Sequence, residues 1–338
     1  MKQPRFLHIA AQQAQPGIWT QVFRDALERL GPLTVVERGA ALSEPEHVGL
    51  IHAHSILLTG WGASPVPRQI AADRGGLEYI CHITGTLRDA IPWEVIESGI
   101  PVTNWGDAPA NDIAEGTMAL LLATLKDLHK QARAIEDDAW ALDSHTSGGA
   151  LHGLNVGLYG FGAIGKRFAE MIRPFNPVLR IYDPYVKSVH TQGLAVNSLE
   201  ELFSRSEAVV ILAALNATTR RSVTAELLAR LPKYGIVINT ARGAIVDQEA
   251  LLAELASGRL RAGLDVLEPD ELPKGHPARK FSNCTLTAHA IHRGWPDDHQ
   301  PPTRLSRMHL ICLDNVKRHM AGEALRFLMD RERYLRST

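Results

Sequence analysis

Residues 155–165 read NVGLYGFGAIG, and this stretch decides how the chain folds. It begins with an apolar run, which predicts a buried strand, and it ends in three glycines spaced GxGxxG. The sequence KRFAEMIRPF over 166–175 follows and is compatible with a helix. A second apolar run over 178–182 then leads into Asp183. Strand, glycine-rich turn, helix, strand and acid, in this order, are typical of a unit that binds a dinucleotide.

Each part of this pattern has a physical task in holding a dinucleotide. Gly160 permits a tight turn, Gly162 lets the backbone approach a pyrophosphate, and Gly165 lets the helix pack closely on the strand. The first N–H groups of that helix have no partner within it, so they can bind the phosphate anion. Asp183 would accept hydrogen bonds from the adenosine ribose. Its charge would repel a 2′-phosphate, so the sequence predicts NAD as the cofactor.

Length and composition indicate an ordinary globular protein with two domains. The chain has 338 residues, which is more than one hydrophobic core usually serves. Hydrophobic residues make up 45% of the chain and charged residues 22%, and the formal net charge is −1 at pH 7. Because there is no basic block, we expect no nucleic-acid partner. No apolar run reaches the roughly 18 residues of a membrane span, so we expect no membrane partner.

The cysteines and the N-terminus bear on the compartment. Cys81, Cys284 and Cys312 are far apart and form no CxxC pair. So few cysteines, in an odd number, favour a reducing compartment over a disulfide framework. Residues 1–17, MKQPRFLHIAAQQAQPG, hold one short apolar run, which favours a first strand over a signal peptide. These features together predict a cytoplasmic protein.

Alternating strand and helix patterns predict a small parallel sheet in the first part of the chain. The short apolar runs that favour strands lie at 6–11, 33–36, 50–53, 79–84 and 102–103. Helix-compatible segments at 19–30 and 92–98 lie between them. This rhythm predicts a flavodoxin-like domain over residues 1–105. Residues 303–327 predict a helical tail too short to be a domain, so we expect residues 295–338 to pack back on this first sheet.

The rest of the chain predicts a second sheet around the glycine-rich turn. A long helical pattern over 111–139 precedes that turn. Further strands are predicted over 209–212, 235–239, 262–266 and 284–286. We therefore expect an α/β protein with two Rossmann-like domains. Residues 106–294 would form a doubly wound parallel sheet that binds the dinucleotide, and the smaller flavodoxin-like domain would bind the substrate.

Polar side chains follow three strands of the second sheet and could carry catalysis. Arg242, in INTARGAIVD, could hold a carboxylate through two parallel hydrogen bonds. The sequence AGLDVLEPDELP over 262–273 supplies several acids. His289, in LTAHA, could donate a proton near neutral pH if it is paired with a carboxylate. Each alone could be a surface ion pair or a hydrogen-bonded histidine, but three at successive strand ends favour an active site.

The combination of GLYGFGAIG, NTARGAIVD, GLDVLEP and LTAHA resembles the D-isomer-specific 2-hydroxyacid dehydrogenase family, which includes glyoxylate/hydroxypyruvate reductases. The likeness covers nearly the whole chain. It implies an NAD(H)-dependent oxidoreductase that transfers a hydride between nicotinamide and C2 of a small 2-oxo or 2-hydroxy acid. The alternative is a non-catalytic NAD-binding regulator, because a corepressor-like branch shares this fold.

The resemblance also implies roles for individual residues. Arg242 would orient the substrate, His289 would be the acid–base, and Asp270 would orient the imidazole. Backbone N–H groups of Thr86 and Leu87 would hold the substrate carboxylate. The residues implied in cofactor binding are Thr117, Gly160, Phe161, Gly162, Ala163, Ile164, Gly165, Asp183 and Asp265.

Family relatives pair through the dinucleotide domain, so the resemblance implies a homodimer. The segment over 136–151 would reach across to the partner, with Trp140 as an anchor. The turn-like SHTSGG within it could instead be a surface loop.

The sequence departs from the family pattern in the substrate-binding part. Where the family has a glutamate, this chain has Asp270, which is one methylene shorter, and Glu268 or Glu271 could pair with the histidine instead. The glycine of the family's substrate loop is Leu87 here. Bulky residues at 292–295 would crowd the nicotinamide end. These departures bear on the substrate more than on the fold or the cofactor.

Two further patterns allow alternative interpretations. His54 follows His52 on the predicted strand and occupies the place where relatives often have an arginine, so we treat it as a candidate substrate contact. A histidine pair could also bind a metal, but no third ligand has supporting spacing, so we expect no metal. The polar residues at 187–190 could accept a 2′-phosphate and favour NADP, an interpretation that the charge of Asp183 opposes.

Overall fold

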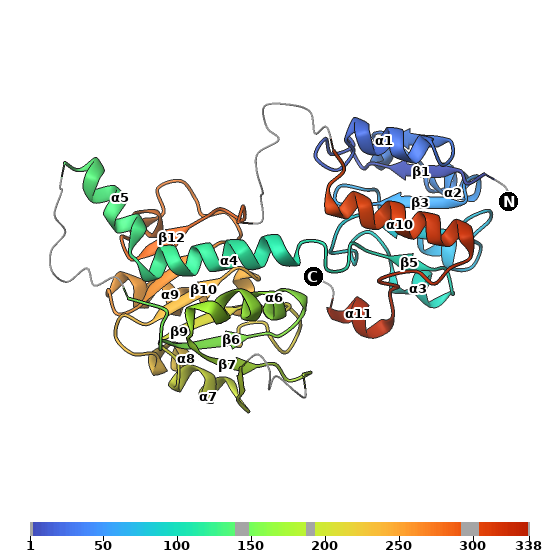
Figure 1. Ribbon diagram of the computed structural model, residues 1–338. Coiled ribbons are helices and arrows are strands. Elements are labelled where there is room, and N and C mark those ends of the chain that lie inside the picture. The colour runs from blue at the N-terminus through green and yellow to red at the C-terminus, as the bar shows by residue number, and fades with distance from the viewer. Residues whose placement is uncertain (1–2, 139–148, 187–192, 292–303, 337–338) are drawn as a thin grey trace. The chain divides into compact units, whose positions relative to one another are not determined.

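The structure is a computed structural model of the chain (Figure 1). The residues that it describes are 3–138, 149–186, 193–291 and 304–336. Among them, no helix is both long and apolar enough to cross a membrane. The predictions for Trp140, for residues 187–190 and for residues 292–295 lie outside the described part of the chain.

The chain divides into two compact units. Met1–Pro109 together with Trp295–Thr338 make up unit 1, and Ala110–Gly294 make up unit 2. Unit 1 is therefore built from two separate stretches of sequence, whereas unit 2 is one continuous stretch.

Unit 1 contains a five-stranded parallel sheet with the order β2-β1-β3-β4-β5. This is the strand order of flavodoxin-like folds. The strands are β1 (Phe6–Ile9), β2 (Leu33–Val36), β3 (Ile56–Thr59), β4 (Tyr79–His82) and β5 (Val102–Thr103). The helices are α1 (Gln21–Glu28), α2 (Glu44–His52), α3 (Trp93–Glu97), α10 (Arg307–Ala321) and α11 (Arg331–Arg336). Alternate strand residues enter two apolar cores, Phe6 one and Leu7 the other, so both faces of the sheet are buried.

The strand predicted over 50–53 is wrong, because these residues end α2 and begin the turn after it. The helix starts with a capping arrangement in which the Glu46 carboxylate accepts a hydrogen bond from the backbone N–H of Ser43 at 2.9 Å. The strand follows later, at Ile56–Thr59, where all four residues are buried. The short apolar run before it was compatible with either structure, and the serine–glutamate spacing SEPE was the signal for a helix.

Unit 2 contains a seven-stranded parallel sheet with the order β12-β11-β10-β9-β6-β7-β8. The first strand in sequence lies inside the sheet and the chain winds outward from it in both directions, which is the doubly wound arrangement. The strands are β6 (Asn155–Tyr159), β7 (Val178–Tyr182), β8 (Leu194–Ala195), β9 (Ala208–Ile211), β10 (Ile236–Asn239), β11 (Arg261–Leu264) and β12 (Cys284–Leu286). The helices are α4 (Ala110–Leu125), α5 (Leu128–Glu136), α6 (Ala163–Ile172), α7 (Leu199–Ser204), α8 (Ala225–Arg230) and α9 (Gln248–Ala256).

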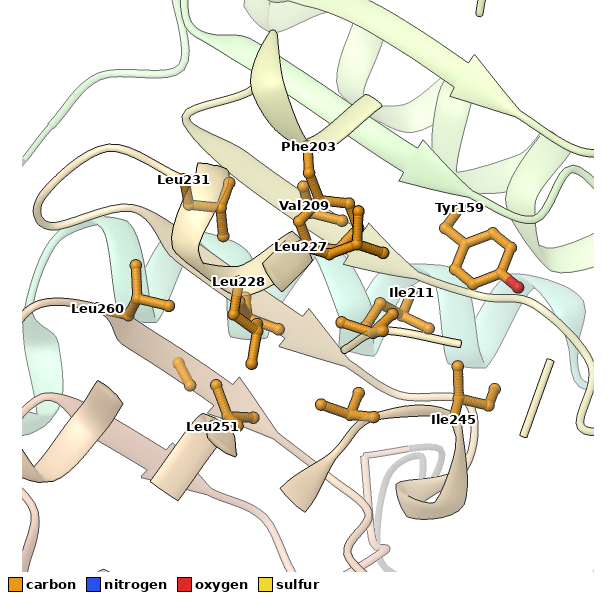
Figure 2. Close-up of a cluster of buried hydrophobic side chains, with 14 of the residues drawn as sticks. Tyr159, Phe203, Val209, Ile211, Leu227, Leu228, Leu231, Ile245, Leu251 and Leu260 are labelled. Atoms are coloured by element: carbon orange, nitrogen blue, oxygen red, sulfur yellow. The ribbon is translucent and has the colours of Figure 1, made fainter. Parts of the chain in front are cut away.

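Separate apolar cores cover the two faces of this sheet. One core contains residues of α4 and α6 with Val156 and Leu158 of β6. Figure 2 shows the other core, in which Phe203 of α7 and Leu228 of α8 lie near Val209 of β9. Because helices bury both faces, the strands other than β8 are largely apolar runs, and this made their positions easy to predict from the sequence. The two-residue edge strand β8 is exposed and was not predicted.

The long helix predicted over 111–139 is two helices. α4 ends at Leu125 and α5 begins at Leu128, and Asp127 between them has a left-handed backbone with φ of 51°. Its carboxylate forms an ion pair with Arg261 of β11 at 3.2 Å. Aspartate tolerates this conformation better than most residues, so the break is built into the sequence.

Two buried histidines lie in the sheet of unit 1. The ring of His8 contacts the carbonyl oxygen of Leu58 at 3.0 Å, and that of His82 contacts the hydroxyls of Thr59 and Thr84, each at 2.9 Å. Burial lowers the pKa of each histidine from its ordinary value of 6.5 to about 4. Both rings are therefore neutral in the folded protein near neutral pH.

We expect unit 1 to lose stability as the pH falls from about 6.5 towards about 4. In this window the unfolded chain binds a proton at each histidine and the folded chain does not, which lowers the free energy of unfolding by about 3 kcal/mol per histidine. His82→Asn should flatten the pH dependence of urea unfolding, whereas the exposed His152→Gln should leave it unchanged. If the free energy of unfolding of His82→Asn depended on pH as strongly as that of the wild type, this explanation would be contradicted.

Candidate functional site

The glycine-rich turn joins β6 to α6. Two of its three glycines are closely packed against backbone atoms, and one is not. Gly160 has φ of 99°, and a Cβ there would lie 2.5 Å from the backbone nitrogen of Ala213. A Cβ on Gly165 would lie 2.3 Å from the carbonyl oxygen of Gly160. A Cβ on Gly162 would meet nothing within 4 Å. The first and third glycines are therefore required by packing, while the second borders open space, as expected where a pyrophosphate approaches.

Asp183 follows β7 and holds the glycine-rich turn. One carboxylate oxygen accepts a hydrogen bond from the backbone N–H of Phe161 at 2.7 Å, and the other accepts one from the N–H of Tyr185 at 2.9 Å. Each carboxylate oxygen has two lone pairs, so acceptor capacity remains for ribose hydroxyls. The residue thus fixes the turn as well as offering a ribose contact, and the ribose contact itself stays a prediction.

The first turn of α6 is accessible to a ligand, whereas the side chain of Thr117 is buried. Ala163 and Ile164 form the first turn of α6, where N–H groups can bind an anion. The side chain of Thr117 is completely buried, where its hydroxyl donates to the carbonyl of Ile113 and lies 2.7 Å from the hydroxyl of Thr240. Thr117 therefore joins α4 to the chain after β10, and its pyrophosphate contact stays a prediction.

Arg242 lies just beyond the carboxyl end of β10. The Asn239 side chain donates to its carbonyl at 3.0 Å, and one guanidinium nitrogen donates to the carbonyl of Ala241 at 2.6 Å. Burial lowers the pKa of Arg242 and the nearby Asp270 carboxylate opposes this shift. Arginine keeps its proton in folded proteins, so the guanidinium is charged and can pair with a carboxylate.

His289 and Asp270 form a hydrogen-bonded pair beyond the ends of β12 and β11. The Nδ1 atom of His289 contacts a carboxylate oxygen of Asp270, and the two side chains are 42% and 52% exposed. The shorter aspartate therefore reaches the imidazole. Glu268, one of the alternative acids, forms an ion pair with Arg220 at 2.9 Å instead. A carboxylate at Nδ1 fixes the ring and the nitrogen that carries its proton, as a histidine acid–base requires.

Asp265 has a role that the sequence did not indicate. One of its carboxylate oxygens accepts hydrogen bonds from the Thr287 hydroxyl at 2.7 Å and from the N–H groups of Ala290 and Ile291 at 2.9 and 3.1 Å. Its carbonyl accepts the N–H of His289 at 2.6 Å. His289 has φ of 55°, a conformation that costs energy outside glycine. Asp265 therefore holds the histidine in place, and its predicted contact with nicotinamide stays a prediction.

Thr86 and Leu87 belong to loop 83–91, which follows β4 in unit 1. Among the hydrogen bonds between described residues, none has the backbone nitrogen of Thr86 or Leu87 as its donor. The Leu87 side chain is completely buried in the apolar core, so leucine in place of the family glycine does not occupy the surface of the loop. Both N–H groups remain candidates for binding a carboxylate.

His54 does not fit the substrate contact predicted for it. The prediction depended on a strand over 50–53, whereas His54 follows α2 and precedes the amino end of β3. Ligands in parallel sheets bind at the carboxyl ends of strands, which is the opposite edge. Its two ring nitrogens contact the carbonyl of Leu50 at 2.7 Å and the hydroxyl of Thr34 at 3.1 Å. The structure thus gives His54 a packing role.

The glycines give a direct test of the turn. Gly165→Ala should lower the melting temperature by several degrees, because the added methyl would collide with a backbone oxygen. Gly162→Ala should leave the melting temperature almost unchanged but weaken NADH binding at least about tenfold, because its methyl would occupy the space for the pyrophosphate. Calorimetry and fluorescence titration of both variants measure the two effects. Undiminished NADH binding by a folded Gly162→Ala would sink the assignment of the turn.

Comparison with known proteins places this site in a family. D-3-phosphoglycerate dehydrogenase of Methanocaldococcus jannaschii is 29% identical over 270 residues, which cover 78% of this chain and 51% of that protein. Hydroxypyruvate reductase of Thermotoga maritima is 33% identical over 197 residues, which cover 57% of this chain and 63% of that protein. The chain thus spans between half and two thirds of the length of these relatives.

Solved structures show the same fold along almost the whole chain. A D-isomer specific 2-hydroxyacid dehydrogenase from Xanthobacter autotrophicus Py2, in complex with NADPH and MES, superposes with a TM-score of 0.76 and 22% identity. The superposition covers 98% of this chain and 100% of that one.

Residues 118–290 match the family described as D-isomer specific 2-hydroxyacid dehydrogenase, NAD binding domain. The match contains the glycine-rich turn, Asp183, Arg242 and the His289–Asp270 pair, and it makes NAD the cofactor of unit 2. Since it covers more than half of the sequence, the chain belongs to the D-isomer specific 2-hydroxyacid dehydrogenase family.

Proposed function

We propose that this protein is an NAD(H)-dependent enzyme that interconverts a small 2-oxo acid and its D-2-hydroxy acid. The observation that carries the proposal is the hydrogen-bonded His289–Asp270 pair, with the charged Arg242 close enough to be influenced by the same carboxylate. All three follow strands of the sheet that contains the glycine-rich turn. An acid–base histidine and a carboxylate-binding arginine beside a nicotinamide site are the groups that this reaction needs.

In the proposed reduction, each residue acts on a defined atom. Arg242 pairs with the substrate carboxylate and polarises the C2 carbonyl. Bound NADH supplies the hydride, which brings two electrons to C2. The carbonyl oxygen takes its proton from protonated His289, whose charge the Asp270 carboxylate neutralises. The reverse reaction returns the proton to the same imidazole, so one residue serves as acid and as base.

The backbone of unit 1 is proposed to bind the far oxygen of the same substrate carboxylate. The N–H groups of Thr86 and Leu87 would hold the carboxylate, which would explain why neither donates to another described residue. Two N–H groups aimed at one anion form a common carboxylate-binding arrangement in proteins.

A second possibility, a non-catalytic regulator that binds NAD, is less well supported. A binding module needs the glycine-rich turn and Asp183 but has no use for a histidine held in a costly conformation beside a carboxylate. The costly backbone conformation of His289 and its contact with Asp270 therefore favour an enzyme.

The activity is tested by following NADH oxidation with a panel of 2-oxo acids that runs from glyoxylate and pyruvate to bulkier side chains. The same assay is repeated with NADPH. The carboxylate of Asp183 should repel the 2′-phosphate of NADPH and weaken its binding. We expect NADH to bind at least tenfold more tightly, a difference of about 1.4 kcal/mol. A folded protein that binds NADH but reduces none of the acids would favour the regulator.

Asp270→Asn should slow reduction at neutral pH by about a hundredfold, because the neutral amide cannot compensate the charge of the proton-donating imidazole. NADH affinity should stay close to that of the wild type. Glu268→Gln is the matched control: this carboxylate lies two positions away and pairs with Arg220, so its loss should change the rate little. If Asp270→Asn kept the wild-type rate, another acid would have to serve His289.

The homodimer is also a proposal, supported by the surface of α5. Leu128 and Ile135 lie seven positions apart on one face of this helix and are 51% and 52% exposed. No residue of α5 is buried, although Arg133 donates to the carbonyl of Lys280 at 3.1 Å. A partner subunit would cover this apolar face.

We expect light scattering at micromolar concentration to give a dimer mass, and Leu128→Asp combined with Ile135→Asp to give a monomer. Leu310→Asp changes an equally exposed leucine on α10 of unit 1 and should leave the mass unchanged. A wild-type monomer would refute the dimer, and a dimer that survives both charges would place the interface elsewhere.

A further inference from the structure

The C-terminal segment, residues 327–335, packs on the edge of the sheet in unit 1. The backbone N–H of Met329 donates to the carbonyl of Val102 at 2.8 Å, and Leu328 forms an antiparallel bridge with Thr103 of β5. Figure 1 shows α11 beside α3 and β5 of the same unit. This arrangement brings residues 327–335 next to loop 83–91, which lies more than two hundred positions earlier in the sequence.

Arg88, in the middle of this loop, is bound to the end of α11. Its Nε atom donates to the carbonyl of Tyr334 at 3.2 Å, and its Nη2 atom donates to the carbonyl of Leu335 at 2.7 Å. Both carbonyls lie in the last turn of the helix, where they have no partner within the helix. One guanidinium thus satisfies two carbonyls and connects the loop to the segment.

The flanks of the loop are tied to the same segment. At one flank, the Tyr334 hydroxyl donates to the carbonyl of Ile91 at 3.0 Å. At the other, the Asn104 side chain donates to the carbonyl of Gly85 at 3.1 Å and accepts from Arg333 at 3.3 Å. The loop is therefore held on both sides of Thr86 and Leu87.

Apolar packing supports these hydrogen bonds. Leu87 and Met329 are buried in the same core, and the rings of Trp93 and Tyr334 lie 5.3 Å apart. Arg333 and Tyr334 are half-buried in this contact, and their burial lowers the pKa of Arg333 and raises that of Tyr334. The segment is thus a packed part of unit 1.

We propose that the C-terminal segment positions loop 83–91 for substrate binding, with Arg88 as the main positioning residue. The inference rests on the proposed function, in which N–H groups of this loop hold the substrate carboxylate. Two N–H groups bind one carboxylate well only if the backbone between them is already fixed, because a mobile loop loses conformational entropy on binding. Arg88 acts through the loop, since its guanidinium is used by the carbonyls of α11.

Arg88→Ala tests this role with two independent readouts. Hydrogen–deuterium exchange of the peptide that covers 83–91 should become faster in the free protein. KM for the 2-oxo acid should rise about tenfold, while kcat and NADH affinity change little. Arg88→Lys should recover only part of the loss, because a single ammonium group cannot reproduce the planar pair of donors.

Two further variants complete the experiment. Arg331→Ala removes an exposed arginine from the same helix and should change neither readout. Tyr334→Phe removes one hydroxyl and keeps the ring, so it should shift both readouts in the same direction as Arg88→Ala by about threefold. This variant decides the question if Arg88→Ala does not fold.

The outcomes separate the explanations. A higher KM with unchanged exchange would mean that Arg88 binds substrate directly, and faster exchange with unchanged KM would mean that the loop does not position substrate. Either result overturns the proposal. If the wild type reduces no 2-oxo acid, the proposed function fails. The exchange measurement still tests the contact separately: unchanged hydrogen–deuterium exchange of residues 83–91 in Arg88→Ala would show that Arg88 does not fix the loop.

Discussion

Parallel pairing of the strands is the constraint on which the rest of this structure depends. Within one parallel sheet all carboxyl ends share an edge, so residues far apart in sequence follow neighbouring strands. In unit 2 this brings the glycine-rich turn after β6, Asp183 after β7, Arg242 after β10 and Asp265 after β11 to a single edge. The same pairing requires helices on both faces, and the helices pack against the strands in two apolar cores.

At that edge, two carboxylates that were predicted to bind the cofactor also hold the backbone of neighbouring turns. Asp183 holds the glycine-rich turn, and Asp265 holds the turn that carries His289. Neither role is visible in a motif, because a motif fixes which residue is present and not which N–H group it contacts. A carboxylate that accepts several N–H groups forms charge-assisted bonds, which are stronger than neutral ones. The conformations of the neighbouring turns depend on these bonds.

The sequence predicted those features that local chemistry determines. Buried parallel strands and the glycine spacing could be predicted because they follow from residue type and order, whereas Asp270 was implied by the family resemblance with Glu268 and Glu271 as alternatives, and the fold pairs it with His289. The errors lie where two structures compete for one pattern. Residues 50–53 suited a strand or a helix, and the break at Asp127 required a left-handed residue within an otherwise helical run. The role of Asp265 depends on tertiary contacts that only the fold provides.

The division of unit 1 between both ends of the chain has a consequence for biosynthesis. Cys312 and Val316 of α10 belong to the same core as Phe6 and Tyr79, so one face of the first sheet, which α1 covers in part, is not fully covered until the ribosome has made α10. Unit 2 is continuous and can fold earlier. The nascent protein therefore carries a partly uncovered apolar face until α10 is made, a state that molecular chaperones recognise and that aggregation threatens.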